Sequence, residues 1–161
     1  MSAWQVTVER RIAAPAGRVW EALTDIEGSP RVISGVERVE VLSEGPFGVG
    51  TRWRETRRMF GKEATEEMYV TACEPPDRYV VAADSRGVHY ISEFVLTPEG
   101  DDATAVRLAF GSKVEKAGFA KLMAKLFGGI GSKAVAKAIA KDLEDIATAV
   151  ESPGTSHPNS R

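Results

Sequence analysis

Residues 116–151 read KAGFAKLMAKLFGGIGSKAVAKAIAKDLEDIATAVE, and helix-forming residues fill most of this stretch around Gly128, Gly129 and Gly131. At 3.6 residues per turn, one apolar face forms before the glycines and another after them. Their members are Phe119, Leu122, Met123, Leu126, Phe127 and Ile130, then Val135, Ile139, Leu143, Ile146 and Val150. On one straight helix these faces would point roughly 170° apart. We therefore predict a long C-terminal helix that bends or breaks near Gly128–Gly131, unless its first half packs against something other than the core.

The length, charge and cysteine content of the chain exclude several classes of protein. Its 161 residues suffice for one hydrophobic core, so we expect a single domain over residues 1–151 and a disordered polar tail over residues 152–161. A formal net charge of −2 argues against a nucleic-acid binder. The single cysteine and the lack of an apolar run of about 20 residues favour a cytoplasmic protein.

Short stretches of alternating apolar and polar residues lie between the start of the chain and the helix. The first covers residues 4–8, and two short helices follow, one opened by Pro15 and one by Ser29–Pro30 with Ser29 as N-cap. Six further strands are predicted at residues 36–43, 51–59, 63–73, 78–84, 88–96 and 103–114. Their short connections favour antiparallel pairing. The sequence thus predicts an α+β fold, a seven-stranded antiparallel sheet with helices gathered on one face.

Alternation along the strands predicts which side chains face the helices. Trp53 and Phe94 mark the inward side of their strands, and every second neighbour turns inward with them. The resulting mixture of large apolar and few polar groups is typical of a ligand pocket, although a partly hydrated sheet edge has the same composition. The candidate ligand-binding residues are Trp53, Glu55, Arg57, Met68, Tyr90, Ser92, Phe94, Leu108, Leu122, Leu126 and Ile130.

Short motifs along the chain carry a resemblance to a known superfamily. They are Ile12, Pro15, Val19–Trp20, Leu23–Asp25, Gly48–Trp53, Glu74–Arg78 and Asp142–Glu144. With the order of the elements, they make residues 6 to about 151 similar to the START-like helix-grip superfamily (SRPBCC), in particular its polyketide cyclase/dehydrase and lipid-transport branch. Its members grip the last helix with a curved sheet around an apolar cavity, and they bind lipids, hormones or polyketides or assist other proteins. The resemblance implies the curvature and the cavity but marks a fold rather than a reaction.

Residues suited to metal or nucleophilic chemistry are scarce. His157 lies in the tail, and alternation places His89 on the outer side of the sheet, away from Cys73. These residues predict neither a zinc site nor an activated nucleophile. The sequence from Gly128 to Lys133 lacks the spacing of a phosphate-binding loop. We therefore expect no metal and no cofactor.

The charged residues of the third and fourth strands allow two interpretations. Glu55 would act as a general base in an apolar cavity, with Tyr90 as proton donor or oxyanion partner, whereas an ion pair with Arg57 is the structural alternative. The remaining charges predict a solvated face with cross-strand ion pairs, made of Arg52, Arg54, Arg58, Lys62, Glu63, Glu66 and Glu67.

Three functions follow from these observations. The first is binding or carrying a small hydrophobic ligand, lipid-like or polyketide-like, between the sheet and the C-terminal helix. The second is a cyclase or dehydratase that uses Glu55. The third is an interaction module whose segment Phe119–Ile130, backed by Lys121 and Lys125, contacts a membrane or a protein. The sequence names neither the ligand nor the oligomeric state.

Overall fold

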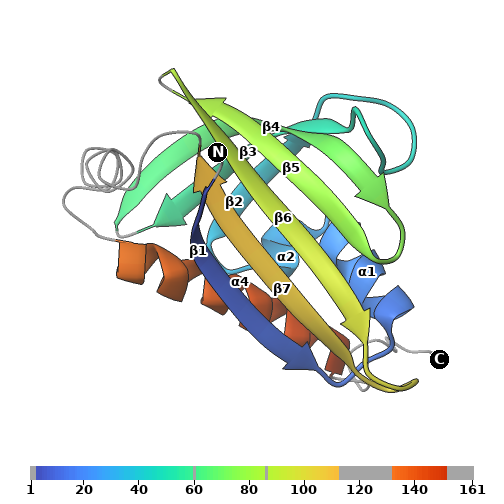
Figure 1. The fold of residues 1–161 in the computed structure, drawn as a ribbon. Coiled ribbons are helices and arrows are strands. Elements are labelled where there is room, and N and C mark those ends of the chain that lie inside the picture. The colour runs from blue at the N-terminus through green and yellow to red at the C-terminus, as the bar shows by residue number, and fades with distance from the viewer. Residues whose placement is uncertain (1–2, 60, 86, 113–131, 152–161) are drawn as a thin grey trace.

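The computed structural model describes residues 3–59, 61–85, 87–112 and 132–151. In this part of the chain a curved sheet carries helices on one side (Figure 1). The elements are β1 (Ala3–Ile12), α1 (Ala16–Thr24), α2 (Ser29–Val32), β2 (Val36–Val41), β3 (Arg52–Met59), β4 (Lys62–Glu74), β5 (Arg78–Ser85), β6 (Val88–Pro98), β7 (Thr104–Ser112) and α4 (Ser132–Glu151). The predicted α+β fold, with two short helices after the first strand, is confirmed.

The seven strands form one sheet in the order β1-β7-β6-β5-β4-β3-β2. Every neighbouring pair is antiparallel, as the short connections predicted for the strands that follow one another from β2 to β7. The turn between β6 and β7 passes through Gly100 at φ +75°, a left-handed conformation that glycine adopts without a steric penalty. Strand β1 pairs with β7, so the first and last strands lie together at one edge of the sheet.

The hydrophobic core lies between the sheet and the helices. Figure 1 shows α4 along the side of the sheet formed by β1 and β7, with α1 close to its C-terminal end. We call the side of the sheet that faces these helices the inner face. The principal cluster of buried side chains joins both layers and contains Ile12, Ala14, Val19, Leu96, Val106, Leu108, Leu143, Ile146, Ala147 and Val150. None of the described helices is both long and apolar enough to cross a lipid bilayer.

Hydrogen bonds fix the C-terminal part of α4 to the segments around it. The Ala13 amide donates to Glu151 Oε2 over 2.7 Å, and Arg18 Nη2 donates to the Val150 carbonyl over 2.9 Å. The second bond satisfies a carbonyl that the helix end leaves unpaired, and it places a cation at the negative end of the helix. The Ser34 amide donates to Asp145 Oδ2 over 2.9 Å. This end of α4 is therefore held by both packing and polar contacts.

Several details of the sequence-based prediction need correction or lie beyond the described residues. Ser29 is the first residue of α2 and not its N-cap, because Gly28 holds that position and Ser29 Oγ donates to the Ile26 carbonyl over 2.8 Å. Helix α2 ends at Val32. The predicted bend or break at Gly128–Gly131, the segment Phe119–Ile130 and the tail all lie outside the described residues.

Candidate functional site

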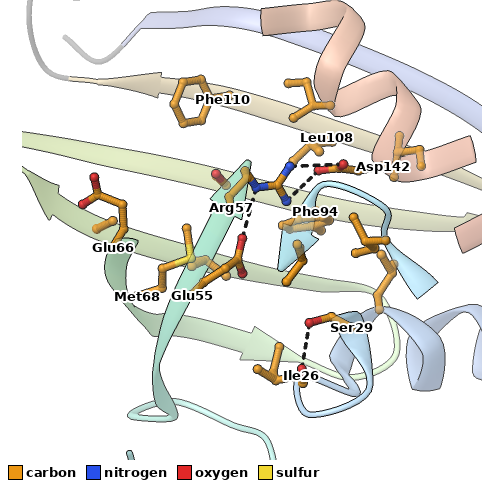
Figure 2. A pocket seen from close by; sticks show the side chains of 18 of the residues that line it. Ile26, Ser29, Glu55, Arg57, Glu66, Met68, Phe94, Leu108, Phe110 and Asp142 are labelled. Carbon is orange, nitrogen blue, oxygen red and sulfur yellow. Dashed lines mark hydrogen bonds and ion pairs between the residues drawn. The ribbon is translucent and has the colours of Figure 1, made fainter. Parts of the chain in front are cut away.

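A cavity of about 270 Å³ lies between the inner face of the sheet and the helices (Figure 2). Its walls are mainly apolar and come from α1, α2 and the connections beside α2, from β2 to β7, and from α4. Apolar cavities of about 150 Å³ already admit benzene, and drug-sized ligands occupy pockets of about 300–1,000 Å³. The cavity is thus large enough for a small organic molecule.

The structure gathers around this cavity every predicted ligand-binding residue that it describes. These residues are Trp53, Glu55, Arg57, Met68, Tyr90, Ser92, Phe94 and Leu108. They come together because residues two apart on a strand point to the same face of the sheet. A few apolar residues that must face the core therefore determine which other side chains of the strand face it too. Leu122, Leu126 and Ile130 lie outside the described residues. Contact of any of these side chains with a ligand stays a prediction.

Arg57 joins the sheet to α4 at the wall of the cavity. Its Nη1 donates to Asp142 Oδ1 over 3.2 Å, and its Nη2 lies 3.0 Å from Asp142 Oδ2, so the guanidinium and the carboxylate meet as a two-pronged pair. Arg57 Nε donates to Glu55 Oε2 over 3.2 Å, and Trp53 Nε1 donates to Glu55 Oε1 over 3.2 Å. Figure 2 shows Arg57 between the two carboxylates. We call Glu55, Arg57 and Asp142 the charged triad.

Burial and charge act against each other in the charged triad. The exposed fractions of the side chains are 13% for Glu55, 21% for Arg57 and 15% for Asp142. Burial alone would lower the pKa of Arg57, but the charges of Asp142 and Glu55 raise it above its ordinary value. Burial raises the pKa of Asp142, although the adjacent Arg57 opposes that rise. The predicted Glu55–Arg57 ion pair is therefore present, and it has a second acid that the sequence analysis missed.

This second acid is Asp142, and the only local sequence signal for it is its position in the helical pattern. It follows Ile139 by three positions and precedes Leu143, so it borders the apolar face of the helix. Acidic residues at that border are usually solvated, and its partner Arg57 lies far away in the sequence. The helical pattern is thus compatible with a place for Asp142 near the inner face, but it does not indicate an ion pair.

A cluster of aromatic rings lies beside the cavity, and two of its members, Tyr79 and Phe94, line it. Tyr79 stacks on Phe94 with a centroid distance of 4.5 Å and an interplanar angle of 5°. Trp20 and Phe47 meet the Tyr79 ring edge-on at 5.4 and 5.2 Å. Burial raises the pKa of Tyr79 above its ordinary value, so its hydroxyl stays protonated. The rings of Tyr79 and Phe94 offer flat apolar walls, which suit a ring or a hydrocarbon chain.

Glu66 lines the cavity, and its assignment to the solvated face was wrong. In the β3–β4 register it lies directly opposite Glu55, and opposed residues of neighbouring strands share a face. Its Oε2 accepts a hydrogen bond of 3.1 Å from Ser85 Oγ. Other cross-strand pairs of that hairpin are confirmed on the outer side, with Arg52 and Glu67 at 2.7 Å and Arg58 and Glu63 at 3.5 Å.

The outer side of the sheet also holds His89, as its parity predicted. Its Nδ1 lies 2.7 Å from Asp84 Oδ1, and Tyr69 donates its hydroxyl to Asp84 Oδ2 over 2.7 Å. Hydrogen bonds from His89 and Tyr69 lower the pKa of Asp84. Within the described ranges, no histidine, cysteine and acidic side chains gather in a group that could hold a metal ion.

Comparison with known proteins identifies a family whose model matches nearly all of the chain. Residues 3–151 match the family model described as polyketide cyclase/dehydrase and lipid transport. No curated protein sequence matches the chain. Among solved structures, TTHA0849 from Thermus thermophilus is 25% identical with a TM-score of 0.72, and the match covers 92% of this chain and 97% of that protein.

Two further structures are similar to this chain in fold. The Zhui aromatase/cyclase from Streptomyces sp. R1128 is 20% identical with a TM-score of 0.73, covering 91% of this chain and 92% of that protein. A START superfamily protein from Mycobacterium smegmatis is 16% identical with a TM-score of 0.65, covering 91% of this chain and 93% of that protein. At these identities the likeness shows the fold alone.

Proposed function

Since the chain belongs to the polyketide cyclase/dehydrase and lipid transport family, we propose that it binds a small hydrophobic molecule between the sheet and α4. The observation that carries this proposal is the apolar cavity of about 270 Å³. The apolar side chains around this cavity lack packing contacts on the side that faces it. A ligand that fills the cavity supplies those contacts.

Apolar burial alone supplies enough free energy for useful binding. Burying about ten methylene groups at roughly 0.8 kcal/mol each yields about 8 kcal/mol of favourable free energy before the costs of association are subtracted. Association and ordering cost several kcal/mol of this gain. The remainder of about 4 kcal/mol corresponds to a dissociation constant of about one millimolar. The proposal therefore needs no covalent or metal-mediated attachment.

A cavity-filling variant tests the proposal directly. Ser92 lines the cavity on β6, whereas its neighbour Ile91 has the opposite parity. We expect the wild-type protein to bind the neutral dye Nile red with enhanced fluorescence. Ser92→Phe should weaken binding by at least about tenfold, because the new ring occupies the ligand volume. The matched variant Ile91→Phe should bind as the wild type does.

Two readouts make the outcome decisive. Circular dichroism establishes that each variant keeps the sheet and helix content of the wild type, and mass spectrometry of freshly purified protein identifies any apolar molecule that copurifies. Equal dye binding by folded Ser92→Phe and Ile91→Phe would contradict binding in the cavity. A wild-type protein that binds neither the dye nor any copurified apolar molecule would contradict the proposed function.

The placement of Glu55 favours a second candidate function, a cyclase or dehydratase. Glu55 and Tyr90 both line the cavity, so a candidate base and a tyrosine border the same space. In this case Glu55→Gln should abolish turnover of a polyketide substrate while the substrate still binds. The engagement of both Glu55 oxygens by Trp53 and Arg57 favours simple binding over this alternative.

A further inference from the structure

The charges around the cavity select the chemical class of its ligand, an inference that rests on the proposed function. The described residues that line the cavity include the acids Glu55, Glu66 and Asp142 but a single cationic side chain, Arg57. With all four groups ionised, their formal charge is three negative charges and one positive charge, or −2. The described part of the cavity wall is thus mainly apolar, and its charged groups carry a net negative charge.

Arg57 has little capacity to receive an anionic ligand. Its Nε, Nη1 and Nη2 all contact carboxylate oxygens, at 3.2, 3.2 and 3.0 Å. Two carboxylates face this one guanidinium, so the triad keeps a net negative charge of its own. A ligand carboxylate would have to displace Glu55 or Asp142 or enter beside them unpaired. Both routes are unfavourable, because an unpaired charge in a poorly hydrated site loses its solvation.

Glu66, by contrast, has no cationic partner among the residues that the structure describes. It accepts a hydrogen bond of 3.1 Å from the neutral Ser85 hydroxyl, and it lies opposite Glu55 in the β3–β4 register. Like charges at directly opposed positions of neighbouring strands repel each other. Figure 2 shows Glu55 turned toward Arg57, with Glu66 apart from that pair. A cation placed beside Glu66 would therefore pair with a carboxylate to which no described residue supplies a positive charge.

We propose that the ligand of this cavity is an apolar molecule with a basic amine, whose ammonium group lies against Glu66 while its hydrocarbon part fills the space beside Met68 and Phe94. The apolar part supplies most of the affinity, and the ammonium supplies the selectivity. A charge pair at about 4 Å in a partly hydrated site is attractive, whereas the same geometry repels a carboxylate. Fatty acids are consequently poor ligands.

A matched series of ten-carbon compounds tests this selectivity. Decylamine, decanol and decanoate share a hydrocarbon chain and differ in head-group charge at neutral pH. Each competes with Nile red at concentrations below those at which it forms micelles. We expect decylamine to bind more tightly than decanol, and decylamine to exceed decanoate by at least about tenfold.

Variants assign the preference to Glu66. Glu66→Gln should reduce the ratio of decylamine to decanol affinity by at least about threefold, because it removes one negative charge and keeps the size of the side chain. Glu67→Gln is the matched control, since Glu67 is the next residue of β4 and lies on the exposed outer side. It should leave the ratio unchanged.

Each outcome separates this inference from the function on which it rests. Decanoate binding as tightly as decylamine, or an unchanged ratio in folded Glu66→Gln, would overturn the amine preference and leave hydrophobic binding intact. Displacement of Nile red by none of the three compounds, together with no copurified apolar molecule, would overturn the proposed function and the amine preference with it.

Discussion

The two sides of strand β3 place arginine–carboxylate pairs in opposite surroundings. On the outer side, Arg54 and Glu40 meet at 2.8 Å with 44% and 66% of their side chains exposed. On the inner face, Arg57 contacts Glu55 and Asp142 at similar distances, with 21% or less of each side chain exposed. Distance alone would rate the pairs as equal. Burial makes them differ, because it removes the water that otherwise solvates each charge.

This difference assigns separate tasks to the two sides. Exposed pairs contribute little stability and keep the sheet surface hydrated. The charged triad contributes a link between the sheet and α4, and it holds charge at a wall of the cavity. If burial distinguishes the two sides in this way, the same substitution of an arginine should lower the free energy of unfolding far more on the inner face than on the outer side.

The largest predicted effect comes from removing the inner arginine. Arg57→Met leaves Glu55 and Asp142 facing each other in a poorly hydrated site without a cation, so we expect the free energy of unfolding to fall by about 3–5 kcal/mol. Arg54→Met on the outer side should lower it by less than about 1 kcal/mol. Urea denaturation followed by circular dichroism measures both variants.

A double variant sharpens this first prediction. Arg57→Met combined with Asp142→Leu removes the cation and one of its two acids, so part of the lost stability should return. Additive losses in the double variant would indicate that Arg57 and Asp142 act independently. Equal losses in Arg57→Met and Arg54→Met would contradict the distinction between the two sides.

The sequence predicted the inner position of Arg57 because an apolar residue marked the parity of its strand. Trp53 can only face inward in a one-sided sheet, and Glu55 and Arg57 follow at intervals of two. On β4, Met68 was predicted to face inward, and Glu66 lies two residues before it on the same strand, so the same rule places Glu66 inward as well. Its register opposite Glu55 shows this position directly.

Other features of the site depend on distances that a sequence does not encode locally. A bulge between Val70 and Ala72 shifts the register of β4 against β5, so strict alternation fails there and Cys73 pairs with Tyr79. The cavity volume depends on how far α4 stands from the sheet. The periodicity of α4 identified its inward residues, but the separation of the layers results from packing at Leu143, Ile146 and Val150.

The second prediction compares the pKa values of two aspartates, one on each side. Burial raises the pKa of Asp142, so its ionisation opposes folding as the pH rises from about 4, the unfolded value, through the higher folded value. Hydrogen bonds from His89 and Tyr69 lower the pKa of Asp84, so its ionisation favours folding above about pH 4, and this contribution is lost as the pH falls through the lower folded value.

Asparagine variants test these two directions, because the difference in stability between variant and wild type should change with pH in opposite senses for the two sites. As the pH rises, Asp142→Asn should gain stability relative to the wild type, while Asp84→Asn should lose stability relative to it. Urea denaturation at several values between about pH 3 and pH 7 measures both differences. Slopes of the same sign for the two variants would contradict the assignment of opposite surroundings to these carboxylates.

The smallest predicted effect is the response of the two arginines to salt. The Debye length falls from about 10 Å at 0.1 M to about 3 Å at 1 M, so salt screens pairs in water far more than pairs shielded by protein. The small loss in Arg54→Met should therefore vanish in about 1 M sodium chloride, since the Glu40 pair that it removes is already screened. The loss in Arg57→Met should persist, because ions reach the charged triad poorly. A loss in Arg57→Met that vanishes with salt would mean that water enters the cavity wall freely. The triad would then differ from the outer pairs only in position, and the acidic wall could not discriminate between ligand charges.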